Sequence, residues 1–405
     1  MDIVYDPTEN LLFSLLSDSL FDTQLPTCFE GVDYSRLWHE SHKHAVELLI
    51  FSRFPVNLLN SNEYKEVKSE LKSRFSSSLE IWRLHAKLHE LLTDAGIPYV
   101  FLKGCASADY YKDPLMRCMG DVDFFVDRID IDKAVTVLLK AGFIEKKGNR
   151  QHHKTFVYSG VDFELHSEPP GVPSGDAGEV LSDCFLFLIK HTKPCDTPFG
   201  TMMFPSALHH GLLLLLHSAH HLTSDGLGLR HLADWAVFIS SMSVGTSFEA
   251  LKDVLRSSGL VVFADLLTSA AETIGCNRVF FGEEPDDETA KELFYDIFSS
   301  GNFGQKKENR QHEMLLTVVK SRDSGYHSYV GKLFDSANTI VVRKWPAAAS
   351  LPFLYPIGWL FFGLRYIIRS IFGKRASIHV KQVITNASSR NRLYEKLHLF
   401  EKECE

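Results

Sequence analysis

The feature that most constrains the fold is the stretch of residues 97–127, IPYVFLKGCASADYYKDPLMRCMGDVDFFVD. A short apolar run at residues 99–102 predicts a strand, and the pair Lys103-Gly104 breaks it. Residues 121–126, DVDFFV, predict a second strand. The chain therefore has to turn back within about twenty residues, which favours two strands of one small sheet.

The second of these strands carries two carboxylates. Successive side chains of a strand point to opposite faces, so Asp121 and Asp123 share one face while Val122 and Phe124 lie on the other. Two adjacent carboxylates repel each other unless a cation sits between them. The pair is a candidate site for a divalent metal ion, although solvated strand ends explain many Asp-x-Asp pairs.

The flanking sequence completes an α+β pattern. Apolar residues recur at helical spacing in residues 63–94 and again in residues 131–139. Further strands are predicted at residues 143–146, 153–158 and 161–166, the last two around a turn at Ser159-Gly160. These elements predict a small mixed sheet flanked by helices, with an N-terminal helical segment and a helical C-terminal region.

The last predicted strand, VDFELH, holds a third carboxylate. By alternation Asp162, Glu164 and His166 share one face of this strand. If the strand lies beside the one that carries Asp121 and Asp123, Glu164 joins them in a three-carboxylate cluster. His166 is then either a group that orients the metal ligands or a packed histidine.

The motifs LKG, DPLMR, DVDFFV and DFELH together resemble the nucleotidyltransferase (polymerase beta-like) superfamily, in particular its family of uncharacterised bacterial nucleotidyltransferases. The resemblance covers residues 80–170 and implies a glycine turn followed by metal-binding carboxylates on two strands. Carried over to this sequence, Asp121 and Asp123 are the metal-binding pair and Glu164 is the third carboxylate. All three would be both catalytic residues and metal ligands.

The resemblance also assigns the residues that bind the nucleotide. Gly104 is the turn glycine, and Lys103 and Arg117 are the cations nearest the triphosphate. The superfamily often has Gly-Ser or Gly-Gly at this turn, whereas this chain has Cys105 after the glycine, so a serine contact to phosphate is missing. Lys103 as a surface residue, and Arg117 as a structural partner of Asp113, are the alternatives.

The chemistry implied by the resemblance fits these residue types. Two Mg²⁺ ions about 3.5–4 Å apart can stabilise both the attacking and the leaving oxygen of a phosphoryl transfer. Carboxylate oxygens suit Mg²⁺, with Mn²⁺ as an alternative ion. The expected reaction moves a nucleoside monophosphate, such as that of ATP, from an NTP to an acceptor and releases pyrophosphate.

The helical region beyond the sheet is rich in histidine. Ten of the 19 histidines lie between His152 and His231, and His217 and His221 are four residues apart. A zincin site is not expected, because the glutamate of the HExxH motif is missing. Arg230, in the segment LRHLAD, is an alternative contact to the nucleotide.

Charge and cysteine content indicate which partners and which cellular compartment to expect. The chain has 405 residues and a formal net charge of -8, which argues against an extended nucleic-acid surface. Seven cysteines without metal-ligand spacing indicate reduced thiols and a cytoplasmic location. The N-terminus MDIVYDPTENLLF has neither the basic nor the apolar region of a signal peptide, so none is expected.

An apolar-basic segment follows near the C-terminus. Residues 357–371 form a helical apolar stripe, with Arg365 and Arg369 interrupting it, so a spanning helix is not expected. The stripe in 357–375 either contacts an anionic membrane surface or packs on the catalytic domain. The predicted division is therefore 1–95 (N-terminal helices), 96–167 (catalytic core), 168–345 (helical acceptor region) and 346–405 (apolar-basic helix and tail).

The sequence leaves three functions open. The first is transfer to an unidentified small molecule, peptide or protein, with the oligomeric state undefined. The second keeps the fold but makes an RNA or tRNA end the acceptor, as in toxin-like relatives. The third is a catalytically silent nucleotide-binding or membrane-associated scaffold, which would be favoured only if Glu164 points away from Asp121 and Asp123.

Overall fold

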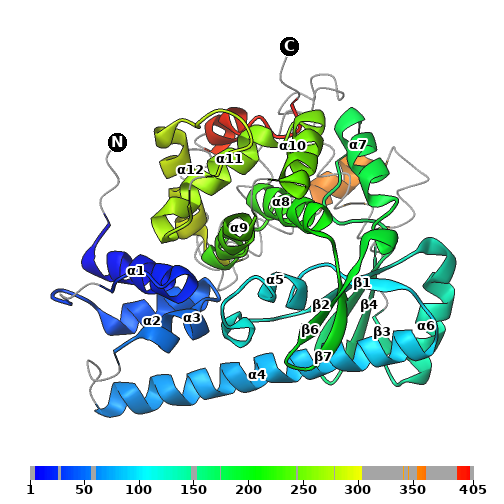
Figure 1. Cartoon of the computed structure of the whole chain (residues 1–405), viewed down its shortest axis with the longest axis horizontal. Coiled ribbons are helices and arrows are strands. Elements are labelled where there is room, and N and C mark those ends of the chain that lie inside the picture. The colour runs from blue at the N-terminus through cyan, green and yellow to red at the C-terminus, as the bar shows by residue number, and fades with distance from the viewer. Residues whose placement is uncertain are drawn as a thin grey trace.

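The computed structural model describes most of the chain up to residue 302 and two short segments beyond it. The described ranges are 5–25, 29–55, 61–146, 153–173, 175–242, 245–277, 279–302, 354–361 and 390–401, together with residues 341 and 345. Within these ranges the protein is a mixed α+β structure, in which a small sheet lies against a larger group of helices (Figure 1). The predicted fold class is confirmed.

The sheet has five strands in the order β1-β2-β5-β4-β3. Their bounds are β1 Tyr99–Phe101, β2 Val122–Val126, β3 Ile144–Glu145, β4 His153–Tyr158 and β5 Val161–His166. Strands β2 and β5 pair in parallel, and all other neighbours are antiparallel. The parallel pair requires a crossover between its strands, and helix α6 (Ile131–Lys140) with strands β3 and β4 supplies it.

The turn between β4 and β5 shows how the sequence sets the register. Ser159 has a φ of 50° and Gly160 a φ of 78°, so both central residues of this two-residue turn are left-handed. Such turns match the right-handed twist of the strands they join and fix their pairing. As a result Thr155 lies opposite Glu164, and the strand bounds agree with those predicted.

Side chains from helices, strands and a hairpin form the core of the sheet domain. Helix α4 (Ser61–Asp94) runs beneath the sheet and contributes Trp82, Leu88 and Leu92 to this core (Figure 1). Strands β1, β2 and β5 contribute their inward apolar side chains, and a hairpin downstream contributes Met202 and Phe204. Gly96 ends α4 with a φ of 61°, as its sequence position predicted.

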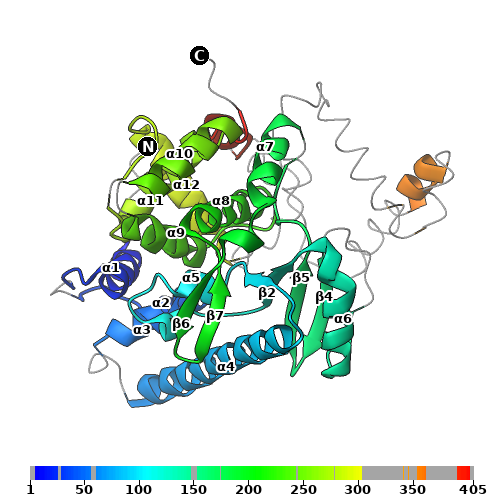
Figure 2. The ribbon, with the colours of Figure 1, turned by 45° about the vertical axis from the view of Figure 1, so that its right-hand side comes forward.

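The remaining helices form a second hydrophobic core. The N-terminal helices are α1 Pro7–Phe21, α2 Tyr34–Lys43 and α3 Glu47–Arg53, and the helices after the sheet are α7 Asp176–Phe185, α8 Ala207–Thr223, α9 Leu229–Ser241, α10 Thr246–Ser258, α11 Val261–Ala271 and α12 Asp287–Ser300. Their buried side chains belong to one cluster, which also takes in residues 393–399. Helices α8 and α9 lie above the sheet, and the short helix α5 (Cys105–Ala108) lies below α9 (Figure 2).

One segment differs from its prediction. The segment TKPCDTPFGT is rich in Pro and Gly, a composition that predicts a loop, but strands β6 (Lys193–Thr197) and β7 (Gly200–Phe204) form a hairpin there. A two-stranded ladder has only edge strands, so Pro194 is tolerated although it has no N–H to donate. Helix α4 and strand β1 pack against β7, which joins the hairpin to the sheet domain.

The C-terminal predictions fall mainly outside the described residues. Of the apolar stripe, only residues up to 361 are described, and there Ile357, Leu360 and Phe361 are exposed. Across the described part of the chain, no helix combines the length and hydropathy that a membrane crossing needs. The four-part domain division stays a prediction.

Candidate functional site

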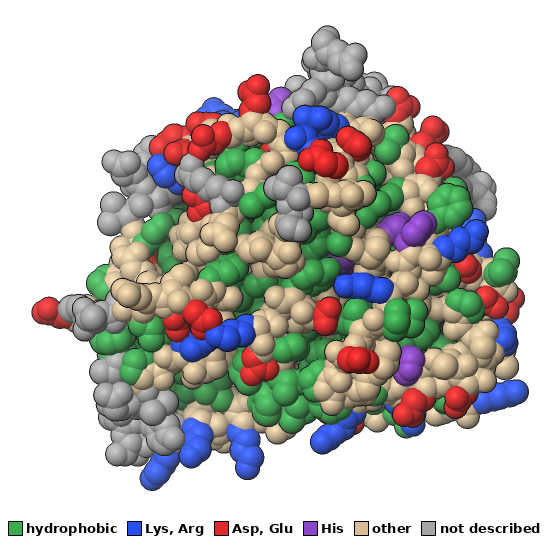
Figure 3. Space-filling model, viewed as in Figure 1, with side chains coloured by type: hydrophobic (Ala, Val, Ile, Leu, Met, Phe, Trp, Pro, Cys, Tyr) green, Lys and Arg blue, Asp and Glu red, His purple; other side chains and the backbone are tan. Residues whose placement is uncertain are grey.

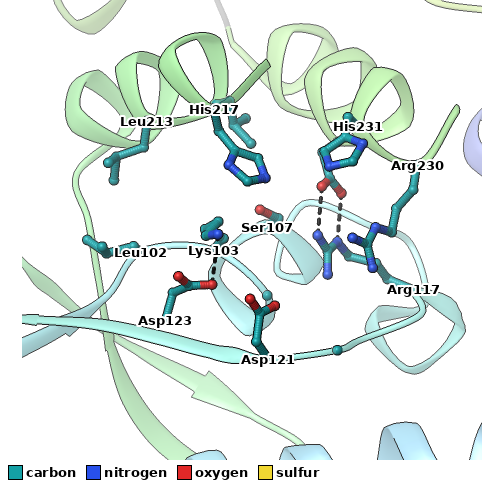
Figure 4. A pocket seen from close by; sticks show the side chains of 14 residues that line it. Leu102, Lys103, Ser107, Arg117, Asp121, Asp123, Leu213, His217, Arg230 and His231 are labelled. Carbon is teal, nitrogen blue, oxygen red and sulfur yellow. Dashed lines mark hydrogen bonds and ion pairs between the residues drawn. The ribbon is translucent and has the colours of Figure 1, made fainter. Parts of the chain in front are cut away.

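The register between β2 and β5 brings the carboxylates of two strands together. Asp123 of β2 lies directly opposite Glu164 of β5 in the parallel ladder, and Phe125 lies opposite His166. Asp121 immediately precedes β2, and Figure 4 shows its carboxylate on the same side as that of Asp123. The condition for a three-carboxylate cluster, adjacency of the two strands, is therefore met.

Asp123 is the most buried member of this cluster. Its Oδ2 forms an ion pair with Lys103 Nζ at 2.9 Å, and its Oδ1 lies 3.0 Å from His166 Nε2. Burial opposes the charged carboxylate, but Lys103 and His166 outweigh it and hold the pKa of Asp123 well below its usual range. Asp123 is thus a fixed negative charge at the floor of the site.

The other two carboxylates experience repulsion. The charge of Asp123 raises the pKa of Asp121, whose side chain is exposed. Burial, followed by the charges of Asp123 and Asp121, raises the pKa of the half-buried Glu164. Three converging carboxylates that destabilise one another's charged forms are stabilised when a divalent cation binds between them.

The donor set fits a divalent metal ion. Asp123, Glu164 and His166 each offer a donor atom, and these atoms lie within 4.8 Å of one another. Carboxylate oxygens are hard ligands of the kind that Mg²⁺ and Mn²⁺ prefer, while His166 adds one nitrogen that also contacts Glu164 Oε2 at 3.7 Å. Asp121, two residues before Asp123 and just ahead of β2, faces the same space (Figure 4).

The turn that carries Lys103 depends on a glycine. Gly104 has φ 63° and ψ -107°, a backbone conformation that L-residues rarely adopt. A Cβ on Gly104 would lie 3.4 Å from Nε2 of the fully buried His85. His85 donates from Nδ1 to the carbonyl of Ile81 at 2.8 Å, and burial lowers its pKa to about 4, so it stays neutral under the turn.

The helix after this turn is shorter than predicted. The segment after Gly104 predicts a helix from Cys105 to Tyr110, but α5 covers only Cys105–Ala108. The N–H groups of Tyr110 and Tyr111 already donate to the carbonyls of Ser107 and Ala108 in tighter turns. A four-residue helix adds little dipole. Backbone N–H groups near a bound phosphate would therefore come from the turn itself.

A pocket lies between the strand ends and the helices above them (Figure 4). Lys103, Asp121 and Asp123 line its floor, and His217 of α8 with Arg230 and His231 of α9 point down into it. The full lining is Leu102, Lys103, Gly104, Ser107, Arg117, Gly120, Asp121, Asp123, Leu213, Leu214, His217, Arg230, His231 and Asp234. The carboxylates and Lys103 on the floor thus face the same space as the guanidinium and imidazole groups of the helices above.

Arg117 lines this pocket but is held by a carboxylate of α9. Its Nε and Nη2 donate to Oδ1 and Oδ2 of Asp234 at 2.6 and 2.7 Å, and Tyr111 Oη donates to the same Oδ1 at 2.7 Å. Both side chains of the ion pair are nearly fully buried. The structural alternative for Arg117 was a pair with Asp113, but Asp113 instead caps a 3-10 turn (Pro114–Met116) by accepting from Leu115 N–H at 3.0 Å.

Arg230 is the second guanidinium in the pocket. It donates from Nη1 to the carbonyl of Cys118 at 3.4 Å, and burial followed by the nearby charge of Arg117 lowers its pKa below the usual value. The sequence offered Arg230 only as an alternative, since a single arginine in a helix carries no positional signal. For Asp234 the sequence favoured a packed, hydrogen-bonded helix residue, but it did not identify the partner, which is 117 residues away in the chain.

One face of the molecule is mixed in charge. On the face seen in Figure 3, described Lys and Arg side chains are interspersed with Asp and Glu side chains. An extended nucleic-acid surface would show as a continuous basic stripe. This face offers no such stripe among its described residues.

The comparison with known families agrees with this geometry. No curated protein matches the chain. A family model described as an uncharacterised nucleotidyltransferase matches residues 30–274, more than half of the 405 residues. The matched region contains the sheet, the pocket and helices α8 and α9. The chain therefore belongs to this family of uncharacterised nucleotidyltransferases.

Proposed function

We propose that the protein transfers a nucleoside monophosphate from an NTP to an acceptor hydroxyl or amine and releases pyrophosphate. The observation that carries the proposal is the parallel pairing of β2 and β5, which sets Asp123 opposite Glu164 beside Lys103 in one pocket. Asp121, Asp123 and Glu164 would hold divalent metal, Mg²⁺ or Mn²⁺. The bound metal would neutralise phosphate charge and lower the pKa of the attacking group.

Asp123, Glu164 and His166 would have different roles in the reaction. Asp123 keeps its charge because Lys103 and His166 lower its pKa. Glu164 has a raised pKa, so it is the carboxylate better suited to accept a proton from the acceptor. His166, 3.0 Å from Asp123 Oδ1, would fix the orientation of that carboxylate.

Phosphate binding would fall to the cations that face the pocket. Lys103 reaches it from the floor and Arg230 from the roof, while Gly104 lets the backbone come close to the phosphates. Arg117 is already bound to Asp234 through two hydrogen bonds. Its contribution would be to add positive potential and to hold α9 over the site.

Two other functions are less well supported. The silent-scaffold alternative required Glu164 to point away from the aspartates, yet Glu164 and Asp123 both contact His166 Nε2, at 3.7 and 3.0 Å. An RNA-end acceptor has no support from the mixed-charge face in Figure 3. A cytoplasmic location, proposed from the cysteine content, is compatible with either enzyme.

The position of the label in the NTP tests the reaction type. We would incubate the protein and Mg²⁺ with each NTP labelled at the α- or the γ-phosphorus, with cell extract as the source of acceptor. Nucleotidyl transfer moves α-label into product and γ-label into pyrophosphate. Transfer of γ-label into product would overturn the proposal and indicate a kinase.

Variants of neighbouring carboxylates test the site. Asp123→Asn and Glu164→Gln are each expected to lower turnover by roughly 10²–10⁴-fold, because each removes a charge from the metal-binding cluster. Asp162→Asn is the matched control, since Asp162 lies on the same strand as Glu164 but pairs with Lys146 at the surface. The site is refuted if Asp123→Asn and Glu164→Gln are as active as Asp162→Asn.

A further inference from the structure

A cluster of three histidines lies at the roof of the pocket, outside the carboxylate site. His217 and His221 are one turn apart on α8, and His231 comes from the first turn of α9. The ring centroids are separated by 4.3 Å for His217 and His221, 5.2 Å for His217 and His231, and 5.3 Å for His221 and His231. The spacing of His217 and His221 could be seen in the sequence. The packing of α8 against α9 adds His231, which the sequence did not connect with them.

We infer that His217, His221 and His231 form a binding site for a transition-metal ion of the Zn²⁺ class, distinct from the carboxylate site for Mg²⁺. Each histidine offers one nitrogen, and the three nitrogens lie within 4.8 Å of one another. A tetrahedral ion with Zn–N bonds of about 2.0–2.1 Å needs its nitrogens roughly 3.3 Å apart. Small side-chain rotations would bring the three nitrogens from their present separations to that distance.

The state of the rings favours a metal over an anion. His221 and His231 are buried and His217 is half-buried, and burial lowers the pKa of all three, that of His221 to about 3. A neutral imidazole presents a lone pair that binds a metal ion, and it carries no positive charge that would attract a phosphate. Imidazole also prefers Zn²⁺, Co²⁺ or Ni²⁺ to Mg²⁺.

The surroundings oppose this binding only in part. Lys103 and Arg230 place positive charge near the cluster, whereas Asp123 places negative charge near His221. His231 Nδ1 accepts a hydrogen bond from Gly228 N–H at 3.4 Å, which is long for such a bond. The ring can therefore change tautomer at small cost. His217 and His231 line the pocket, so the remaining coordination position would face it.

Co²⁺ titration of the whole protein tests the inference. The protein is stripped with chelator and titrated in excess Mg²⁺, which occupies hard carboxylate sites and leaves imidazole sites for Co²⁺. Wild type is expected to take up one Co²⁺ with the strong visible absorption of a tetrahedral ion, and Zn²⁺ should displace it. His217→Gln and His231→Gln are each expected to weaken binding by roughly 100-fold, since each removes one of three ligands.

His220→Gln is the matched control, because His220 is an exposed histidine on the same helix with its ring 5.4 Å from that of His221. It should leave the Co²⁺ spectrum unchanged. X-ray absorption of the Zn²⁺ form counts imidazole ligands in wild type and needs no variant. Fewer than three imidazoles, or a Co²⁺ signal lost in Asp123→Asn but kept in His217→Gln, would overturn the inference.

A third outcome distinguishes an anion site. If wild type binds no Co²⁺, and the histidine variants instead weaken binding of inorganic tripolyphosphate, the cluster is a wall of the phosphate site and the metal site does not exist. Metal binding by wild type in the absence of any nucleotidyl transfer would leave the histidine site standing and refute only the proposed enzyme.

Discussion

The ion pair between Arg117 and Asp234 ties the segment before β2 to helix α9, and so fixes the roof of the pocket above its floor. Asp234→Asn keeps an oxygen that can accept from Tyr111 Oη, but it removes the negative charge opposite Arg117. The guanidinium is then buried without its counter-charge. Removing one partner of a buried pair costs about 3–5 kcal/mol of unfolding free energy.

Urea unfolding followed by tryptophan fluorescence measures this loss, because Trp235 is fully buried beside Asp234 on α9. The matched control is Asp162→Asn, whose carboxylate also binds a cation through both oxygens, Lys146 Nζ at 2.6 and 2.8 Å, but with both side chains about half exposed. An exposed pair contributes about 0–1 kcal/mol, so the control should change little.

A double variant separates the cost of an unpaired charge from the net value of the pair. Arg117→Met combined with Asp234→Asn removes both charges and keeps the oxygen that accepts from Tyr111 Oη, so it should recover most of the lost stability. The reasoning is refuted if Asp234→Asn destabilises the protein no more than Asp162→Asn does. It is also refuted if the double variant is less stable than Asp234→Asn alone.

Three further predictions concern the turn, the lysine and a buried histidine. Gly104→Ala should lower NTP affinity and cost about 1–2 kcal/mol of unfolding free energy. Gly96→Ala is the control: Gly96 has a similar φ of 61° but lies in open space, so this change should lower stability and leave NTP affinity unchanged. Equal NTP affinities of the two variants by calorimetry would contradict the prediction. Lys103→Met should weaken NTP binding by roughly 10–100-fold while the exposed Lys112→Met should not, and equal dissociation constants would count against the role of Lys103. Burial lowers the pKa of His210 from 6.5 to about 3, so the unfolded state binds the proton first and stability falls as pH drops below about 6.5, by about 2 kcal/mol at pH 5. His210→Phe should make that fall shallower in urea titrations at each pH, and an unchanged slope would refute the assignment.

Local pattern was sufficient for most of the secondary structure. The strands around Asp123 and Glu164, the turn at Ser159-Gly160 and helices α4 and α6 all agree with the sequence prediction. Each depends on spacing within about ten residues: period two for strands, period 3.6 for helices, and glycine where φ is positive. The hairpin of β6 and β7 was missed because Pro and Gly usually mark loops.

The sequence by itself determined which residue types carry chemistry and on which face of their strand they lie. It determined that Asp121 and Asp123 share a face, that Glu164 and His166 share another, and that Gly104 follows Lys103 at a turn. Only the tertiary structure decided that these faces meet, because the pairing of β2 with β5 joins residues about 40 apart in the chain. It also decided that Arg117 is held by Asp234 and that His231 joins His217 and His221, since contacts over such distances depend on helix packing and leave no periodic trace in the sequence.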